Sequence, residues 1–459
     1  MQLMTPSPKV PVRRALATAT AGLLGASFGG VEASGLTIPN APWQADTALY
    51  VYHEGSGGVS AYEPMLSMHR TDAYDRTVSL KLTLDAVSGA SPTGGVPQRT
   101  AVTHTGASGQ SSYVTPANNI PVDPNFKDHR VSLSGGLDRP WGRDQRLSLG
   151  GGLSVEGDFF SVSGNAAVAR EFNDKNTTLS YGVGLEYDQI SPKGGPPNAL
   201  QSPNATTTTP VVAQTCTSAS GRPVSCSGGA TNTASRTVLS GLVGVSQVMA
   251  RRWLTQVNLG LEYGSGYFND PYKIISVINP ITGNPVGDAF VTEGRPSSRT
   301  RASLFWQNKI HPFSEDVIDV SYRLYRDDWG ITSHTVDAHY RFEVPSAGFY
   351  IEPHWRSYRQ GAANFYHPWL VDGVDYNQTT HSANVAYASA DRRLGAMKAQ
   401  TVGAKLAFAL GHEEELGLRL EHYTQTSQQP TGGPAYFDSV QVVPDLSATM
   451  LMVTYSFNY

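Results

Sequence analysis

Apolar and polar residues alternate with a period of two through most of this chain. Residues 77–87 read TVSLKLTLDAV, in which valine, leucine and alanine alternate with serine, lysine, threonine and aspartate. Successive side chains of a strand point to opposite faces, so one face of this segment is apolar and the other is polar. The pattern predicts a strand with an apolar environment on one side and water on the other.

The same alternation predicts further strands on both sides of this segment. With 77–87 they make a total of sixteen, an even number, as closed single-chain bacterial barrels have. The other predicted strands are residues 45–54, 58–69, 131–137, 147–155, 159–171, 179–187, 239–245, 253–263, 302–306, 318–324, 336–342, 349–355, 402–410, 416–420 and 451–459.

The last of these segments, LMVTYSFNY, continues the alternation to the end of the printed sequence. Tyr455, Phe457 and Tyr459 share its apolar face, and polar residues stand between them. Chain ends of soluble domains are usually poorly ordered, whereas an aromatic strand here has a lipid bilayer to face. We therefore predict that these three residues belong to the strand that closes a barrel.

The lengths of the connections are a second, independent signal. The predicted short turns are 70–76, 139–144, 172–176, 249–252, 310–316, 343–348 and 411–415, and the predicted long loops are 88–127, 189–234, 265–297, 359–398 and 425–446. Short periplasmic turns opposite long extracellular loops are typical of outer-membrane barrels. The predicted fold class is all-β, an antiparallel transmembrane β-barrel of about 16 strands. The alternative, a soluble sandwich or propeller, would have turns of similar length at both ends.

The first 33 residues have the organisation of a secretory signal peptide. Lys9, Arg13 and Arg14 precede the run ALATATAGLLGASFGG, and Val31-Glu32-Ala33 offers a cleavage site before Ser34. The run is 16 residues long and contains threonine and glycine, whereas a transmembrane helix needs about 20 apolar residues. We predict a signal peptide over 1–33, an outer-membrane β-barrel over 34–459, and the cell outer membrane as the location.

Composition supports a barrel and excludes one class of partner. The chain has 46 glycines, 22 tyrosines and only 16% charged residues, which is unusual for a soluble enzyme. A barrel explains these values, because apolar lipid-facing residues alternate with polar lumen-facing residues, so the hydropathy averages out along each strand. The formal net charge of −4 implies no basic surface for nucleic acid.

Several segments resemble a known family. TLDAVSGASPTGG (83–95), SGYFNDPYK (265–273), YRLYRDDWGITSH (322–334), RSYRQGAANFYHPW (356–369) and ASADRRLG (388–395) are similar to signature segments of a domain-of-unknown-function family of proteobacterial outer-membrane β-barrel proteins. The resemblance implies the same fold and location, with outer-membrane lipid and the barrel-assembly machinery as partners. It also implies a small lipoprotein or a periplasmic redox protein as a further partner, and it implies no cofactor.

Charged residues concentrate on the inward positions of three neighbouring predicted strands. The predicted lumen lining consists of Asp319, Arg323, Tyr325, Asp337, His339, Arg341, Glu352, His354, Arg356 and Tyr358. A ladder of cross-strand ion pairs and hydrogen bonds explains these residues structurally, and a selectivity lining explains them functionally. One ladder can serve both purposes. Histidine and carboxylate spacing on strands is weak evidence for a metal, so we expect no dedicated metal site.

Asp327, Asp328 and His334 form a second group, around a predicted external turn. A carboxylate beside an imidazole can activate water for hydrolysis at the rim of a barrel. Aspartate at the start of a tight turn that contains Gly330 explains the same residues through backbone capping. No second carboxylate pair and no Gly-x-Ser-x-Gly elbow accompanies them, so we expect no enzymatic activity.

The two cysteines, Cys216 and Cys226, lie in a long loop that is rich in threonine and serine. In an exported protein such a pair predicts a disulfide that closes the loop. A reactive thiol pair would be expected to show Cys-x-x-Cys spacing or a nearby base.

These observations predict a channel or porin-like pore whose substrate the sequence does not identify. The alternative is a non-conducting barrel scaffold for a periplasmic or surface partner in extracytoplasmic redox chemistry or export. A surface hydrolase is the least favoured alternative. Both leading hypotheses require the same polar lumen, so the sequence does not separate them.

Overall fold

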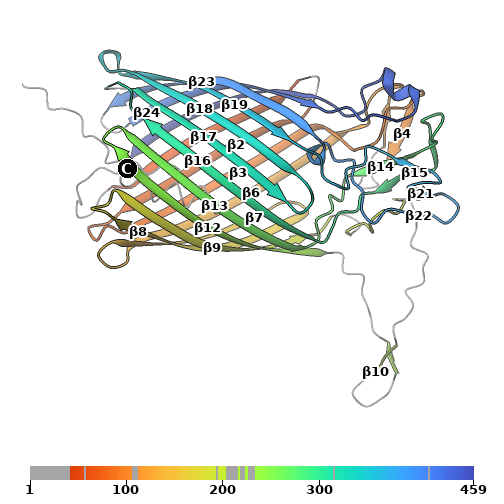
Figure 1. Cartoon of the computed structure of the whole chain (residues 1–459), viewed down its shortest axis with the longest axis horizontal. Helices are drawn as coiled ribbons and strands as arrows, with labels where there is room; N and C mark the ends of the chain where they lie inside the picture. The colour runs from red at the N-terminus through yellow and green to blue at the C-terminus, as the bar shows by residue number, and fades with distance from the viewer. Residues whose placement is uncertain are drawn as a thin grey trace, which may run out of the picture.

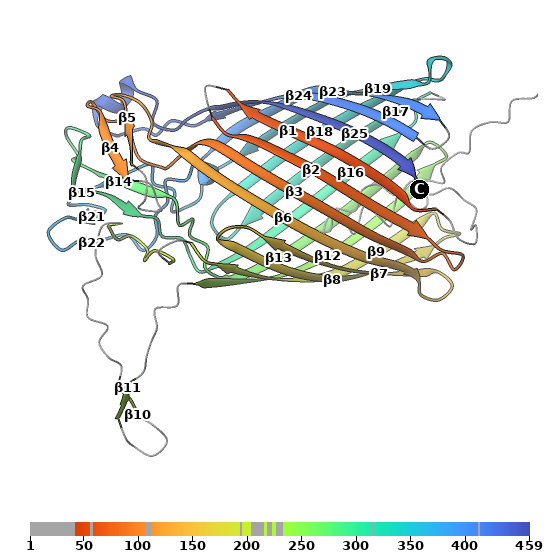
Figure 2. The ribbon, with the colours of Figure 1, turned by 180° about the vertical axis from the view of Figure 1, so that it is seen from behind.

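The computed structural model of the chain describes residues 42–55, 58–105, 112–192, 195–202, 215–217, 223–225, 233–313, 316–411 and 414–459. Among them, sixteen strands form one closed antiparallel barrel, in which each strand pairs with its neighbours in the chain and the last pairs with the first (Figures 1 and 2). The predicted fold class and number of strands are confirmed. The predicted signal peptide, 1–33, lies outside the described residues.

The barrel strands follow one another around the wall in sequence order. They are β1 (Gln44–Glu54), β2 (Ser60–Thr71), β3 (Thr77–Pro92), β6 (Val122–Pro140), β7 (Gln145–Val155), β8 (Phe159–Phe172), β9 (Thr177–Ile190), β12 (Ala234–Ala250), β13 (Trp253–Gly266), β16 (Ser298–Ile310), β17 (Asp316–Asp327), β18 (Thr332–Val344), β19 (Phe349–Gln360), β23 (Met397–Gly411), β24 (Glu414–Ser427) and β25 (Leu446–Asn458).

The period of two separates the two faces of the wall. Apolar side chains on the outer face are widely exposed, for example Leu259 at 48% and Val402 at 56%. Their neighbours on the inner face are polar and buried, for example Asn258 at 2% and Thr401 at 6%. An apolar belt of this kind is stable in lipid but not in water.

The C-terminal segment closes the barrel, as predicted, but the strand ends at Asn458, so it includes Tyr455 and Phe457 and not Tyr459. Strand β25 pairs with β1, with Tyr455 opposite Thr47 and Phe457 opposite Ala45. The rings of Tyr455 and Phe457 stack with centroids 5.3 Å apart. Tyr459 lies just beyond the strand, where its amide donates to the carbonyl of residue 43 at 2.7 Å. The closing seam therefore satisfies its backbone hydrogen bonds to the end of the strand.

The two ends of the barrel differ in their connections, also as predicted. One end carries the short connections that follow β2, β6, β8, β12, β16, β18 and β23, with the short helix η1 (Pro345–Ala347) in the one after β18. The other end carries the long connections 93–121, 191–233, 267–297, 361–396 and 428–445. We call the described residues of these five long connections the cap.

The cap contains small sheets and short helices of its own, which lie beyond one end of the barrel in Figure 1. No helix within the described ranges is long and apolar enough to cross a membrane. The cap elements are β4 (Val102–Thr105), β5 (Ser112–Thr115), β10 (Thr215–Thr217), β11 (Pro223–Ser225), β14 (Ile274–Ile278), β15 (Pro285–Thr292), β20 (Leu370–Val371), β21 (Tyr376–Asn377), β22 (Ser382–Ala383), η2 (Arg392–Leu394) and η3 (Ala435–Ser439).

Buried apolar clusters hold the cap connections together. One cluster joins three connections and comprises Leu200, Ile275, Val277, Val291, Leu370, Tyr376, Ala388 and Ala390. Another cluster joins a different set of three connections and comprises Val96, Ile278, Phe437, Val442 and Val443. Ile275, Val277 and Leu370 are 0% exposed. Because burial of such side chains is strongly favourable in water, the cap is a folded layer and not a set of independent loops.

The cap spans from one side of the barrel mouth toward the other. Connections 93–121 and 267–297 leave strands that are six positions apart in the ring of sixteen. The amide of Ile274 donates to the carbonyl of Thr93 at 2.9 Å, and Lys273 Nζ donates to the carbonyl of Pro92 at 2.5 Å. Burial lowers the pKa of Lys273. These bonds tie connections from distant strands into one structure.

Charged residues are buried within the cap as well. Arg295 contacts Glu293 at 2.7 Å and Asp391 at 2.9 Å, and Arg393 contacts Asp391 at 2.5 Å. Burial alone would raise the pKa of Asp391, but Arg393 and Arg295 hold it well below its usual range. An acid with a lowered pKa stabilises the fold above its unfolded pKa of about 4 and loses this effect only in stronger acid.

The two faces of the wall should respond differently to the same substitution. We expect Val183→Arg, on the outer face of β9 at 60% exposure, to lower the free energy of unfolding by about 2–4 kcal/mol if it lies near the bilayer midplane. Ser163→Arg is the control, because Ser163 faces inward opposite Glu186. Urea unfolding in lipid vesicles measures both. Equal losses at the two positions would contradict the assignment of the faces.

Candidate functional site

The charged wall of the lumen is built by β17, β18, β19, β23 and β24. The strand register sets Asp319 opposite His339, His339 opposite His354, and Asp337 opposite Arg356. The alternation along each strand keeps these side chains on the inner face. The predicted lining residues of β18 and β19 thus meet in one ladder.

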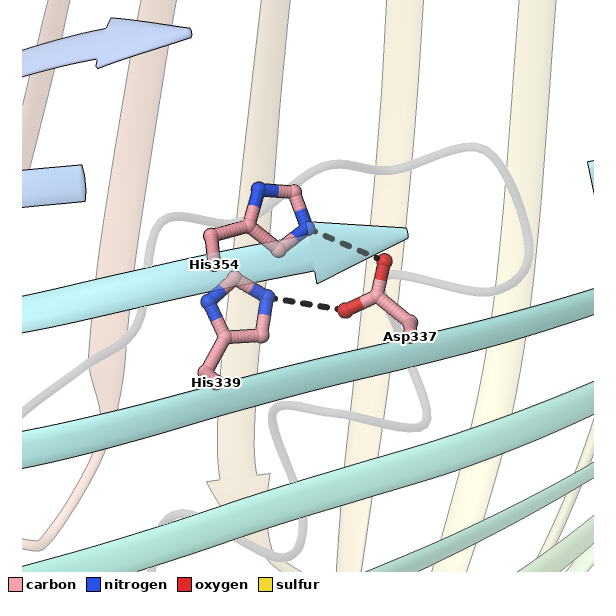
Figure 3. A group of neighbouring side chains, drawn as sticks. All are labelled: Asp337, His339 and His354. Atoms are coloured by element: carbon pink, nitrogen blue, oxygen red, sulfur yellow. Dashed lines mark hydrogen bonds and ion pairs between the residues drawn. The ribbon is translucent and has the colours of Figure 1, made fainter. Parts of the chain in front are cut away.

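Asp337, His339 and His354 form the centre of this ladder (Figure 3). Nε2 of His339 lies 2.8 Å from one carboxylate oxygen of Asp337, and Nε2 of His354 lies 3.3 Å from the other. The two imidazole rings stack in parallel, with centroids 4.1 Å apart and an interplanar angle of 4°. The His354 side chain is 5% exposed and that of Asp337 is 12% exposed. One carboxylate therefore contacts two imidazoles in a site that is largely shielded from solvent.

Each histidine also faces a second carboxylate through its other ring nitrogen. His354 Nδ1 lies 2.8 Å from Glu421 Oε1 on β24. His339 Nδ1 lies 3.5 Å from Glu352 Oε1 on β19. Each imidazole therefore sits between two carboxylates, with its Nε2 toward the shared Asp337.

Arginines surround this centre and contact its carboxylates. Arg419 contacts Glu352 at 3.1 Å and Glu421 at 3.0 Å, and Arg341 contacts Glu352 at 3.3 Å. Arg356 forms an ion pair with Asp337. The wall is an interlocked network in which each of these carboxylates contacts at least one cation.

Gly403 leaves space for the contact between Glu421 on β24 and His354 on β19, which lie on either side of β23. It lies between His354 and Glu421, opposite both in the strand register. A Cβ atom there would lie 2.3 Å from the carbonyl oxygen of Leu420 and 2.5 Å from Cγ of Glu421. The missing side chain lets Glu421 extend across β23 to His354 on β19.

Five participants in the wall were not among the predicted site residues. Arg419 and Glu421 belong to the centre, and Lys405 Nζ contacts Glu415 at 2.8 Å and the Tyr350 hydroxyl at 2.6 Å. A signal was present in EELGLRLE (414–421), where charged residues alternate with the leucines of the predicted strand 416–420. The sequence could not show that this strand lies two positions from β19.

The remaining predicted lining residues lie outside the histidine centre. Asp319 accepts hydrogen bonds from Gln307 at 2.8 Å and 3.0 Å. The guanidinium of Arg323 lies 5.5 Å from the centroid of the Phe305 ring. The hydroxyls of Tyr325 and Tyr358 donate to Asp327 and Gln360, respectively.

The opposite side of the barrel has small side chains. In the ring of sixteen, β7, β8 and β9 lie eight positions from β19, β23 and β24, respectively. Their central inward residues are Ser148, Gly150, Gly152, Ser163, Asn165, Ala167, Ser180, Gly182 and Gly184. A wall of long charged side chains therefore faces a wall of short ones.

The structure separates the residues of the predicted external turn. The Asp327 carboxylate contacts Arg299 at 2.5 Å and accepts from the Ile331 amide at 2.8 Å. The Asp328 carboxylate accepts from an amide of β16 at 3.0 Å. His334 bonds to Tyr322 at 2.7 Å on the outer face. The two carboxylates therefore have structural roles and do not converge on the imidazole.

The predicted disulfide is not addressed by the described residues. Cys216 lies in β10, which pairs with β11. Cys226 lies outside the described residues. The pairing of the two cysteines stays a prediction.

Comparison with protein families matches residues 13–457 to one family, described as "Protein of unknown function (DUF3570)". No curated protein sequence matches the chain.

Solved structures that resemble the fold include several outer-membrane proteins. OccK2 (OpdF) of Pseudomonas aeruginosa in complex with glucuronate shows 10% identity and a TM-score of 0.38, over 92% of this chain and 100% of the other. OccD3 (OpdP) of the same organism shows 9% identity and a TM-score of 0.39, over 99% of this chain and 100% of the other. A bacterial polysaccharide outer membrane secretin shows 9% identity and a TM-score of 0.41, over 92% of this chain and 100% of the other. All three TM-scores are below 0.5, so no conclusion about function rests on these likenesses.

The close packing at Gly403 leads to a prediction. We expect Gly403→Ala to lower the free energy of unfolding by about 1–3 kcal/mol, because the added methyl group overpacks the wall and displaces Glu421. Gly241→Ala is the control, because a Cβ at Gly241 meets no atom within 4 Å. Urea unfolding in vesicles compares the two variants. A Gly403→Ala protein as stable as the control would show that this contact is not tight.

Proposed function

Since the chain belongs to the DUF3570 family, whose function is unknown, we propose its function from its geometry: a pore-forming protein of the outer membrane. The observation that carries this proposal is the closed barrel of sixteen strands with an apolar outer face and a charged inner wall. Backbone polar groups are fully paired in such a barrel, which makes it one of the two structures that can span a bilayer. Outer-membrane lipid and the barrel-assembly machinery are the partners that this proposal requires.

The dimensions of the barrel support a passage for water and polar solutes. Barrels of about 16 strands are wide enough to leave an aqueous channel. The small residues of β7, β8 and β9 leave space in front of the charged wall on the other side. Both signs of charge line that wall, so the passage favours polar solutes over apolar ones. The substrate is not assigned.

The cap gives this pore a covered mouth. Its connections are joined across the ring by the Ile274–Thr93 hydrogen bond and by shared apolar clusters. A folded layer over the mouth narrows the entrance, so the proposed pore passes small solutes and conducts less than an open barrel of the same size.

The cap also favours a second candidate, a non-conducting barrel that holds a partner. A small lipoprotein or a periplasmic redox protein would then be the partner, as the family resemblance implied. Single-channel recording in planar bilayers separates the two candidates. The pore proposal expects discrete conductance steps from the purified parent protein. Their absence from a correctly folded, heat-modifiable protein would contradict the pore and favour the scaffold.

Loosening the cap should increase conductance. Leu370→Ala removes a side chain that is 0% exposed in the cluster joining three cap connections. Such a change typically costs about 2–5 kcal/mol of local stability. We therefore expect larger or more frequent openings than in the parent. Val374→Ala is the control, because Val374 is 64% exposed in the same connection. Identical recordings from the two variants would show that the cap does not restrict the passage.

Reversing one lumen charge should change ion selectivity without disrupting the network. Arg323 contacts Phe305, and none of the described carboxylates forms an ion pair with it. We expect Arg323→Glu to shift the reversal potential across a salt gradient toward cation selectivity. The control is Arg143→Glu, at an exposed turn outside the lumen. An unchanged reversal potential for a conducting Arg323→Glu protein would exclude this wall from the ion path.

A further inference from the structure

We propose that Asp337, His339 and His354 bind a divalent transition-metal ion in the lumen wall. The proposal reverses our expectation from the sequence, which showed only that these residue types occur on neighbouring strands. The structure adds their convergence on one point, the orientation of both rings and the carboxylates behind them. Metal binding does not depend on whether the barrel conducts.

The ligand atoms already lie close to the positions that a metal requires. One atom from each of the three residues lies within 4.8 Å of the other two. Metal–nitrogen and metal–oxygen distances of about 2.0–2.2 Å place tetrahedral ligand atoms roughly 3.3–3.6 Å apart. His354 Nε2 lies 3.3 Å from one carboxylate oxygen of Asp337, which is within this range, and His339 Nε2 lies 2.8 Å from the other oxygen, which is shorter. A small movement of the His339 ring away from Asp337 would bring the shorter distance into this range.

The second ring nitrogens provide an independent argument. A histidine that binds metal through Nε2 usually donates its Nδ1 proton to a carboxylate, which fixes the tautomer and the ring orientation. Here His354 Nδ1 faces Glu421 at 2.8 Å, and His339 Nδ1 faces Glu352 at 3.5 Å. Both rings therefore present Nε2 to the same side, in the arrangement that a shared ion needs. A simple ion-pair ladder does not require two imidazoles to have the same orientation.

The charges around the centre are compatible with a cation. Asp337, Glu352 and Glu421 surround the two imidazoles within the distances given above. Arg419 and Arg341 contact the two outer carboxylates, whereas Arg356 is the cation in contact with Asp337. The Arg356 side chain is 52% exposed, so it can move into the lumen when an ion takes its place beside Asp337.

The donor set indicates which ions are favoured. Two imidazoles and one carboxylate suit zinc, copper, nickel and iron, whereas magnesium and calcium prefer sites made of oxygen ligands. Three protein ligands leave at least one coordination position for water or a solute. Since β18 and β19 supply the ligands and β24 supports one of them, the ion would join three strands of the wall.

Binding of zinc to the purified full-length barrel tests the proposal. After removal of loosely bound metal by dialysis, titration calorimetry should show one Zn²⁺ per chain and no comparable binding of Mg²⁺. Asp337→Asn and His354→Gln should abolish stoichiometric binding. Glu421→Gln should weaken binding by about 10–100-fold, as loss of such supporting carboxylates typically does.

The matched control is Asp319→Asn, the same change at an inward carboxylate opposite His339 on the neighbouring strand. It should bind zinc as the parent does, and all variants should be compared in the folded, heat-modifiable form. Zinc X-ray absorption of the parent needs no variant and should show two imidazole ligands. No stoichiometric zinc in the folded parent, or a spectrum without imidazole, would overturn the proposal.

Discussion

The architecture depends on one constraint, the need to pair every backbone N–H and C=O group where water is absent. The pairing of β25 with β1 meets it by removing the two free edges that sixteen strands would otherwise have. Once the wall is closed, alternate side chains must enter different surroundings. The outer residues form an apolar belt, and the inner ones form the polar lining in which the histidine centre lies.

The cap is stabilised by different interactions from the barrel wall, because it lies beyond the barrel strands. Its stability comes from conventional apolar clusters, in which Leu370 and Tyr376 are fully buried, and from enclosed ion pairs such as Arg295–Asp391. Segments that carried the family resemblance meet where the cap contacts the short connection between β17 and β18. The ring centroid of Trp329, in that connection, lies 5.6 Å from that of Phe268 and 5.1 Å from that of Phe365, both in the cap. The segments that resemble the family therefore lie in the cap as well as in the barrel wall.

The sequence predicted the wall better than the cap or the site, for a physical reason. A strand between lipid and water has a local period of two, so segments such as 77–87 could be recognised without knowing their neighbours. Contacts such as Ile274–Thr93 join residues far apart in the chain and leave no periodic signal. The histidine centre was predicted in part, because β18 and β19 are consecutive. Its supports Arg419 and Glu421 were missed, because Gly403 determines whether β24 can reach it.

If the wall separates lipid from water, neighbouring residues of one strand must differ in their access to a water-soluble reagent. Val320 and Ser321 are neighbours on β17 and face outward and inward, respectively. With the native cysteines replaced by serine, the protein is reconstituted in liposomes and treated with a water-soluble maleimide. We expect rapid labelling of Ser321→Cys and little labelling of Val320→Cys. Equal labelling of the two positions would contradict the separation of lipid from water by the wall.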